Sequence, residues 1–85
     1  MLDVTIYSAR GCGYCQSAEY LLKRKGVQNL IKIQVDIEPE QRARMIARTG
    51  RRTVPQIFIG DAHVGGFDDL AALEKSGQLD ILLSQ

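Results

Sequence analysis

The spacing of hydrophobic residues changes several times along the chain, and each change predicts a new element of secondary structure. Short β-prone segments between glycine, proline and polar residues predict strands over residues 4–7, 30–37, 56–59 and 62–64. Apolar residues at helical spacing, each run ending near a glycine, predict helices over residues 14–25, 39–49 and 68–77. A last helical turn is predicted around Leu79, Leu82 and Leu83.

Two of these segments also carry a prediction of which side chains are buried. Over residues 30–37 the apolar residues alternate as in a half-buried strand, which places on one face Ile31, Ile33, Val35 and Ile37. The helix that begins at Pro39 is amphipathic, and its expected core-facing residues are Ala43, Ile46 and Ala47. The arginines of this helix then lie on its other faces.

The order of the elements, β-α-β-α-β-β-α, predicts one α/β domain over residues 1–85. Strands joined through a helix run parallel, so the first two strands form a parallel pair. The two-residue spacing Gly60-Asp61 between the last two strands is typical of an antiparallel hairpin. We therefore expect a four-stranded mixed sheet flanked by helices.

Composition and charge narrow the classes of partner. The 85 residues include 11 basic and 10 acidic side chains, and a net charge of +1 offers no extended field for nucleic acid or an anionic membrane. No apolar run approaches the roughly 20 residues of a membrane-spanning helix, and the first ten residues do not resemble a secretory signal. We expect a cytoplasmic monomer that recognises its partner locally.

Cys12 and Cys15 are the strongest chemical signal in the sequence. Two cysteines are too few for the disulfide framework of a small secreted domain, so redox or metal chemistry in a reducing compartment is favoured. Cys12 opens a helix, where free N–H groups and the helix dipole stabilise a thiolate. Cys15 shares the packed face with Ala18 and Leu22. We predict Cys12 as the nucleophile and Cys15 as the resolving thiol of a redox-active disulfide.

The alternative for this cysteine pair is half of a structural zinc site. Such a site needs four protein ligands, and besides the two cysteines the chain offers only His63. We therefore predict no metal bound by the chain's own residues. His63 is expected to be a surface residue of an edge strand, without a catalytic role.

Thr53-Val54-Pro55 precedes the third predicted strand and allows two interpretations. Proline fits the first position of a strand because that residue need not donate to the ladder. Alternatively, a cis Val54-Pro55 bond would turn the Val54 backbone outward, where an extended peptide could pair with it. The residues alone leave both interpretations open.

Gly65-Gly66, followed by Asp68-Asp69, also allows two interpretations. The segment is either a tight turn with acids at a helix start or a ligand site. In a site, the helix N-terminus would take a carboxylate and an aspartate would take an ammonium group. That combination suits the zwitterionic head of an α-amino acid.

A basic cluster lies before Thr53 and comprises Arg42, Arg44, Arg48, Arg51 and Arg52. Most of these side chains are expected to be a solvated surface, and the alternative is part of a carboxylate site.

The motifs CGYC after VTIY, TVP before QIFI and GGFDDL at the last main helix together make the chain resemble the glutaredoxins over nearly all of its length. The resemblance implies a thioredoxin-like fold with a cis proline before the third strand. It also implies reduction of glutathione mixed disulfides and protein disulfides, with glutathione as the reductant. The expected partners are glutathione and glutathionylated or disulfide-containing proteins.

The resemblance further implies a glutathione site made of Cys12, Tyr14, Arg42, Thr53, Val54, Pro55, Gly66, Asp68 and Asp69. In this site Cys12 takes the glutathionyl group and Tyr14 lines the groove. The Val54 backbone pairs with the glutathione cysteine. Gly66, Asp68 and Asp69 hold the γ-glutamyl head, and Arg42 meets the glycine carboxylate.

Two departures from the family pattern keep other functions open. Ala9 stands where many glutaredoxins have a lysine, with Arg10 one place along. Gly13 replaces the proline of CPYC members, and relatives that lack this proline sometimes share a glutathione-ligated 2Fe-2S cluster between two subunits. The alternatives are therefore an iron–sulfur cluster carrier or sensor, and a hydrogen donor to ribonucleotide reductase.

Overall fold

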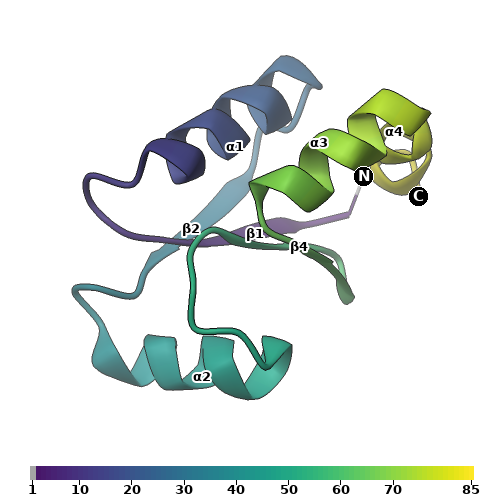
Figure 1. Ribbon diagram of the computed structural model, residues 1–85. Helices are drawn as coiled ribbons and strands as arrows, with labels where there is room; N and C mark the ends of the chain where they lie inside the picture. The colour runs from purple at the N-terminus through teal and green to yellow at the C-terminus, as the bar shows by residue number, and fades with distance from the viewer. Residues whose placement is uncertain (1) are drawn as a thin grey trace.

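Four strands form one mixed sheet, and helices cover both of its faces (Figure 1). The computed structural model describes residues 2–85. The strands are β1 (Val4–Ser8), β2 (Leu30–Gln34), β3 (Gln56–Ile59) and β4 (Ala62–Gly65). The helices are α1 (Gly13–Arg24), α2 (Pro39–Thr49), α3 (Phe67–Ser76) and α4 (Gln78–Leu83). The predicted order of elements and the Gly60-Asp61 hairpin are confirmed.

The strand order β2-β1-β3-β4 places the two central strands in opposite directions. β1 runs parallel to β2, with Val4 opposite Leu30, and this confirms the parallel pair. β1 runs antiparallel to β3, with Tyr7 opposite Gln56. The end of β1 and the start of β3 therefore lie side by side at one end of the sheet. This pairing brings the segment that leads to Cys12 next to the segment that leads out of Pro55.

The two faces of the sheet carry cores of different size. Helices α1, α3 and α4 cover one face (Figure 1), where the buried cluster comprises Val4, Ile6, Ala18, Leu21, Leu22, Val27, Ile57, Ile59, Leu70, Leu79 and Leu83. Helix α2 covers the other face, where the buried cluster comprises Tyr7, Val35, Met45 and Phe58. Alternate residues of β1 and β3 point to opposite faces, as the period of a strand requires.

β2 is shorter than its hydrophobic pattern predicts. The strand ends at Gln34, and the Ile37 N–H turns back to the Gln34 carbonyl. Ile31 and Ile37, expected in the core, are 45% and 52% exposed, whereas Val35 is buried. The prediction of one buried face over residues 30–37 is therefore wrong at both ends. β2 is an edge strand, and the small core under α2 covers only part of its face.

The buried face of α2 also differs from the prediction. Met45 is the buried residue of the helix, whereas Ala43 and Ala47 are exposed and Ile46 is half-buried. The long methionine side chain reaches the sheet, and Ile46, from the predicted face, packs against the same cluster. Arg48 fills the adjacent space, because its guanidinium stacks 3.9 Å from the Phe58 ring centroid and donates to the Tyr7 hydroxyl at 2.8 Å.

Within residues 2–85, no helix has both the length and the apolar character needed to cross a lipid bilayer.

Candidate active site

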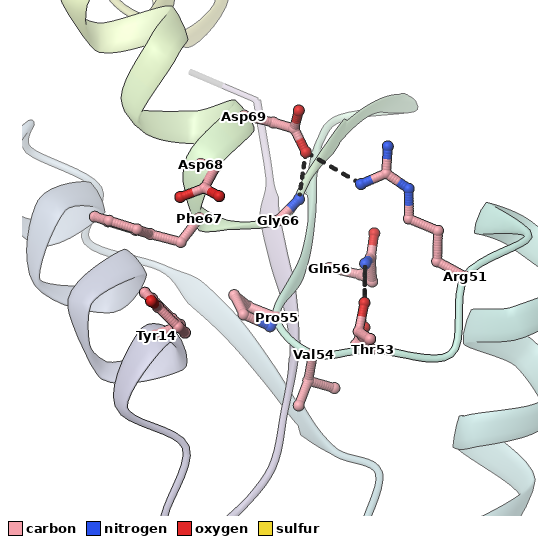
Figure 2. Close-up of a pocket in the computed structure, with 10 residues that line it drawn as sticks. All are labelled: Tyr14, Arg51, Thr53, Val54, Pro55, Gln56, Gly66, Phe67, Asp68 and Asp69. Carbon is pink, nitrogen blue, oxygen red and sulfur yellow. Dashed lines mark hydrogen bonds and ion pairs between the residues drawn. The ribbon is translucent and has the colours of Figure 1, made fainter.

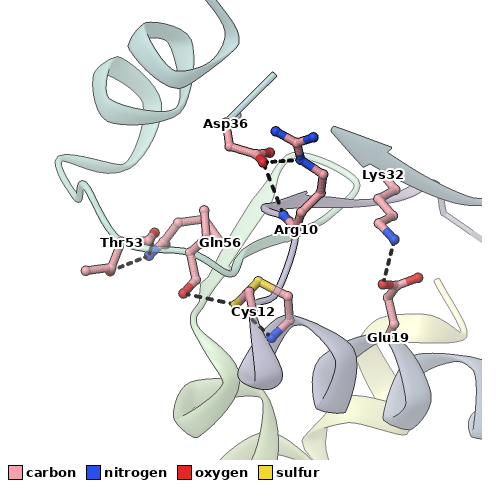
Figure 3. Close-up of a disulfide and its surroundings, with 9 residues drawn as sticks. Arg10, Cys12, Glu19, Lys32, Asp36, Thr53 and Gln56 are labelled. Carbon is pink, nitrogen blue, oxygen red and sulfur yellow. Dashed lines mark hydrogen bonds and ion pairs between the residues drawn. A yellow bond between two sulfur atoms is a disulfide. The ribbon is translucent and has the colours of Figure 1, made fainter. Parts of the chain in front are cut away.

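Cys12 lies at the N-terminus of α1, where the chain arrives from β1. It is the N-cap residue of the helix, with an extended backbone at φ −90° and ψ 106°. Its Sγ accepts a hydrogen bond from the Cys15 N–H at 3.2 Å (Figure 3). A thiol in this position satisfies one free donor of the first helical turn, and a thiolate there is stabilised by the same donor and by the helix dipole. The local structure therefore favours the reactive form of this cysteine.

The two cysteines are bonded to each other and differ in access. Cys12 and Cys15 form a disulfide, with their Cα atoms 5.2 Å apart. Cys12 is half-buried, whereas Cys15 is only 1% exposed and lies on the packed side of α1 with Ala18 and Leu22. The first turn of α1 contains no acidic residue, so the helix itself places no carboxylate beside a negative charge on Cys12. This arrangement has the accessible and the sheltered sulfur that a dithiol exchange requires.

Val54 and Pro55 form a wall beside Cys12. The Val54-Pro55 peptide bond is cis, as the resemblance implied. The Val54 carbonyl oxygen lies 3.9 Å from Cys12 Sγ, a contact that becomes a hydrogen bond only when the thiol is reduced. Within residues 2–85 the Val54 N–H donates to no protein acceptor. The Val54 backbone is thus available to an extended peptide lying beside the sulfur.

A buried amide supports this wall from behind. Gln56 is fully enclosed, and its Nε2 donates to the Thr53 carbonyl at 3.1 Å. The His63 Nε2 lies 2.8 Å from Gln56 Oε1, which can only accept, so this ring nitrogen is the donor. His63 lies exposed on the edge strand β4, as expected, and its ring stacks on Phe58. Desolvation of the ring, followed by the charge of Arg51, lowers the pKa of His63 below its ordinary value.

A pocket of about 250 Å³ extends from this wall to the start of α3 (Figure 2). Its lining residues are Tyr14, Arg51, Thr53, Val54, Pro55, Gln56, Gly66, Phe67, Asp68 and Asp69. The rings of Tyr14 and Phe67 stack with their centroids 6.1 Å apart and close one side. Arg51 reaches across the other side from the loop after α2, as Figure 2 shows. The pocket therefore has an aromatic side and a charged side.

The Asp69 carboxylate is fixed in the pocket by two hydrogen bonds. Its Oδ2 accepts the Gly66 N–H at 2.9 Å and the Arg51 Nη1–H at 3.1 Å. The Gly66 hydrogen bond, and after it the Arg51 guanidinium, lower the pKa of Asp69 below its ordinary value near 3.8. Gly65 makes this position possible, because its φ is +116° and a Cβ there would overlap the Asp69 carboxylate. Gly65 is therefore required by the geometry of the aspartate.

Most of the residues expected in a glutathione site meet in this pocket. Tyr14, Thr53, Val54, Pro55, Gly66, Asp68 and Asp69 all line it, and Cys12 adjoins it through Val54. Arg42 is not a lining residue, and its guanidinium donates to the Arg52 carbonyl at 3.0 Å. Gln56 and Phe67 also line the pocket and were not predicted from the sequence. Arg51 was visible only as one arginine of the basic cluster.

Arg10, next to the position where many glutaredoxins have a lysine, is engaged by an acid. Its Nε donates to Asp36 Oδ2 at 2.8 Å, and its backbone N–H reaches the same oxygen at 3.4 Å (Figure 3). These contacts lower the pKa of Asp36 below its ordinary value. Since the guanidinium is held by the segment that follows β2, it is not a free charge at the sulfur.

Comparisons with known proteins agree with this geometry. The family model described as glutaredoxin matches residues 4–64. A glutaredoxin of Pseudomonas aeruginosa is 52% identical over 84 residues, which are 99% of each chain. The solution structure of glutaredoxin from Brucella melitensis has a TM-score of 0.85 and 55% identity over 98% of this chain and 89% of that one. The crystal structure of a buckwheat glutaredoxin–glutathione complex has a TM-score of 0.88 and 31% identity over 98% of this chain and 77% of that one.

Proposed function

The chain belongs to the glutaredoxin family and is a thiol–disulfide oxidoreductase with a thioredoxin-like fold. We propose that it reduces glutathione mixed disulfides and protein disulfides through Cys12 and Cys15. The observation that carries the proposal is the placement of Cys12. Its sulfur accepts a helix N–H and lies beside the Val54 backbone, at a pocket whose far side holds Asp69. The family uses glutathione, and a neighbouring structure is a complex with it.

The first reaction is the transfer of a glutathionyl group to Cys12. The Cys12 thiolate attacks the sulfur of glutathione in a mixed disulfide, and the bond between that sulfur and the substrate sulfur breaks. The substrate leaves as a thiolate and takes up a proton from water. A second glutathione thiolate then attacks the glutathionyl sulfur on Cys12, which gives oxidised glutathione and restores the Cys12 thiolate.

Protein disulfides require the second cysteine. The Cys12 thiolate opens the protein disulfide and forms a mixed disulfide with one protein sulfur. The thiolate of Cys15 then attacks Cys12 Sγ, releases the reduced protein and forms the Cys12–Cys15 disulfide that the structure contains. Two glutathione molecules return this disulfide to the dithiol and leave as oxidised glutathione.

The proposed position of glutathione follows the pocket. The Val54 N–H and carbonyl pair with the backbone of the glutathione cysteine, between Thr53 and Pro55. Gly66, Asp68 and Asp69 hold the γ-glutamyl head, and the aromatic ring of Tyr14 covers the tripeptide from the α1 side. Arg42 is kept as the proposed partner of the glycine carboxylate, because its anchor on Arg52 places it one residue from Thr53.

Two cysteine variants test this function. We expect Cys12→Ser to lose all deglutathionylation in the glutathione-coupled assay, because serine cannot form the mixed disulfide. Cys15→Ser should keep deglutathionylation and lose the reduction of protein disulfides. Full activity of Cys12→Ser, or an equal loss of both activities in Cys15→Ser, would contradict the assigned roles.

The iron–sulfur alternative requires more than one chain. A 2Fe-2S cluster takes four thiolate ligands, and this sequence has two cysteines. Within residues 2–85 no group of three His, Cys, Asp or Glu side chains could hold a metal ion. The residues of one chain thus do not fit the cluster, and no step is assigned to it. A visible spectrum after anaerobic purification, together with the molecular mass in solution, tests the cluster and the proposed monomer.

Two further predictions from the sequence concern the location of the protein in the cell and its physiological partner. A cytoplasmic location and a role as hydrogen donor to ribonucleotide reductase stay predictions. Comparing reduction by glutathione with reduction by a thioredoxin reductase tests which reductant serves the Cys12–Cys15 disulfide.

A further inference from the structure

Arg51 connects the end of α2 with the start of α3. Gly50 ends α2 in a left-handed conformation, with φ +70°, and the next residue turns toward the pocket. The Arg51 N–H is fixed by the Thr49 hydroxyl at 2.9 Å. The guanidinium then crosses the pocket opening to Asp69, a residue 18 positions later in the chain (Figure 2). Both ends of this side chain are therefore anchored.

The Arg51–Asp69 ion pair leaves hydrogen-bond donors of the guanidinium and one oxygen of the carboxylate available to a ligand. Arg51 uses Nη1, and its Nε and Nη2 make no hydrogen bond or ion pair within residues 2–85. Asp69 uses Oδ2 for both of its bonds, and in the same part of the chain Oδ1 has no partner. The two side chains are 49% and 46% exposed. A ligand in the pocket thus meets a guanidinium edge and a carboxylate oxygen side by side.

The other arginines of the basic cluster are placed differently. Arg48 stacks over Phe58 on the α2 face of the sheet, and Arg42 is bonded to the Arg52 carbonyl. Among the residues that line the pocket, Arg51 is the one with a positive charge. Any anionic group that enters this side of the pocket therefore meets Arg51.

We propose that Arg51 is a specificity-determining residue that binds the α-carboxylate of the γ-glutamyl group while Asp69 binds its α-ammonium. The inference rests on the proposed glutathione site and adds a residue to it. The two charged groups share one carbon atom, so their receptor needs opposite charges at neighbouring positions, as the 3.1 Å Arg51–Asp69 pair provides. The guanidinium fork matches a carboxylate better than a point charge does. The N–H groups of Phe67 and Asp68, which donate to no acceptor within residues 2–85, face the same end of α3.

A second explanation for Arg51 has a different chemical signature. If the guanidinium only orients Asp69, its removal impairs recognition of the ammonium group and leaves recognition of the carboxylate unchanged. Two peptides separate these roles. γ-Aminobutyryl-cysteinyl-glycine lacks the α-carboxylate of glutathione, and glutaryl-cysteinyl-glycine lacks the α-amino group.

The experiment measures the transfer of each peptide to Cys12 in a single turnover. The Cys15→Ser protein is mixed with the disulfide between 2-mercaptoethanol and glutathione, or between 2-mercaptoethanol and either analogue. Mass spectrometry follows the formation of the Cys12 mixed disulfide over time, and this gives the second-order rate constant. The same measurements are made after adding Arg51→Ala, Arg51→Gln, Asp69→Asn or Arg44→Ala. Arg44 is an exposed arginine of α2 outside the pocket and serves as the matched control.

With Arg51→Ala we expect the glutathione rate constant to fall about five- to tenfold, the range for a half-exposed charge-assisted hydrogen bond. The rate constant for γ-aminobutyryl-cysteinyl-glycine should change less than about twofold, since its missing carboxylate has no contact to lose. Arg51→Gln should behave like Arg51→Ala, and Arg44→Ala should leave all three rate constants unchanged. Thermal unfolding of each variant checks that the fold is intact.

Other outcomes overturn the inference. An equal loss for all three peptides would mean that Arg51 acts through the fold or its general field. A loss confined to peptides with the amino group would mean that it only positions Asp69. If the protein without these substitutions transfers all three peptides equally and Asp69→Asn changes nothing, the proposed γ-glutamyl position itself is wrong. Continued transfer to Cys12 in that case would leave the dithiol function standing.

Discussion

Two helix N-termini face the same pocket, and they are built in opposite ways. At α1 the N-cap is Cys12, whose sulfur accepts the Cys15 N–H, and the first turn has no acidic residue. At α3 the N-cap is Gly66, and the first turn contains Asp68 and Asp69. Asp69 reaches back to the Gly66 N–H and is held there by Arg51.

The difference determines which charge each end can receive. The start of α1 keeps its positive potential for a sulfur anion, because its first turn carries no acidic side chain to compensate it. The start of α3 is partly compensated by its own carboxylates, and so it offers an anion to an ammonium group beside N–H donors for a carboxylate. The same local element thus serves bond exchange at one end of the pocket and, as we propose, recognition at the other.

Giving α1 an acidic cap like that of α3 should have the largest effect. Cys12→Asp should abolish disulfide exchange, because a carboxylate cannot form a disulfide, while it still accepts the hydrogen bond at the N-cap. Cys12→Ala should be equally inactive and less stable than Cys12→Asp by about 1 kcal/mol, the usual contribution of an N-cap acceptor. The glutathione-coupled assay measures the exchange, and urea denaturation in the presence of a reductant measures the stability of the two variants. Equal midpoints for the two variants would argue against a capping role for this position.

A glycine near the start of each helix provides the next test. Gly65→Ala should lower the free energy of unfolding by about 2 kcal/mol or more, because its φ of +116° is strained for alanine and the new Cβ meets Asp69. Gly13→Ala is the matched control, since a Cβ there has no atom within 4 Å. Chemical denaturation should show a large loss for the first variant and almost none for the second. Similar losses would mean that the α3 start is not built around Asp69.

The charge at the α3 start is tested by Asp69→Asn. We expect kcat/KM for glutathione mixed disulfides to fall about fivefold through a higher KM, since a half-exposed charged contact contributes modestly. Asp61→Asn, an exposed acid at the β3–β4 turn outside the pocket, should leave kcat/KM unchanged. A loss in kcat with an unchanged KM would place Asp69 in the chemical step and contradict a recognition role.

Acid should remove the contribution of Asp69 in a predictable range. Its pKa is lowered in the folded protein, so its ionised form adds stability that is fully present above the ordinary value near 3.8. This contribution disappears as the pH falls through the lower folded value. The difference in unfolding free energy between the unsubstituted protein and Asp69→Asn should therefore be constant above about pH 5 and shrink below the ordinary value. A difference that shrinks already between pH 6 and about pH 5 would contradict the lowered pKa.

The smallest expected effect comes from adding one acid to the first turn of α1. Gln16→Glu keeps the size of an exposed side chain and places a negative charge near Cys12. The apparent pKa in the pH profile of Cys12 alkylation should rise by about 0.2 to 0.7 pH units, the effect of one exposed charge at a helix N-terminus. The shift should shrink at high salt. No shift at low salt would mean that a charge in the first turn of α1 does not act on the Cys12 thiolate.

Local signals made the α1 end of the pocket predictable. Cys12 follows a strand and opens a helix, and Cys15 falls on its packed face, so their order along the chain already assigns their different access. The hairpin and Pro39 at the start of α2 were readable for the same reason, since their geometry depends on a few adjacent residues.

Features that depend on distant contacts were not predictable in this way. Met45, rather than Ala43 or Ala47, is the residue of α2 that is buried against the sheet, and the periodicity of the helix does not encode which residue reaches it. Ile31 is exposed because β2 is an edge strand. Arg51 looked like its four neighbouring arginines, and only the turn after Gly50 selects it for Asp69.

The contact between Cys12 and Val54 joins residues 42 positions apart, across the antiparallel pairing of β1 with β3. A chain fragment containing only the first strand and α1 would carry the thiol and its helix but no second wall. The second wall therefore forms only when β3 pairs with β1, so the two sides of the site depend on a long-range pairing that neither segment can supply alone.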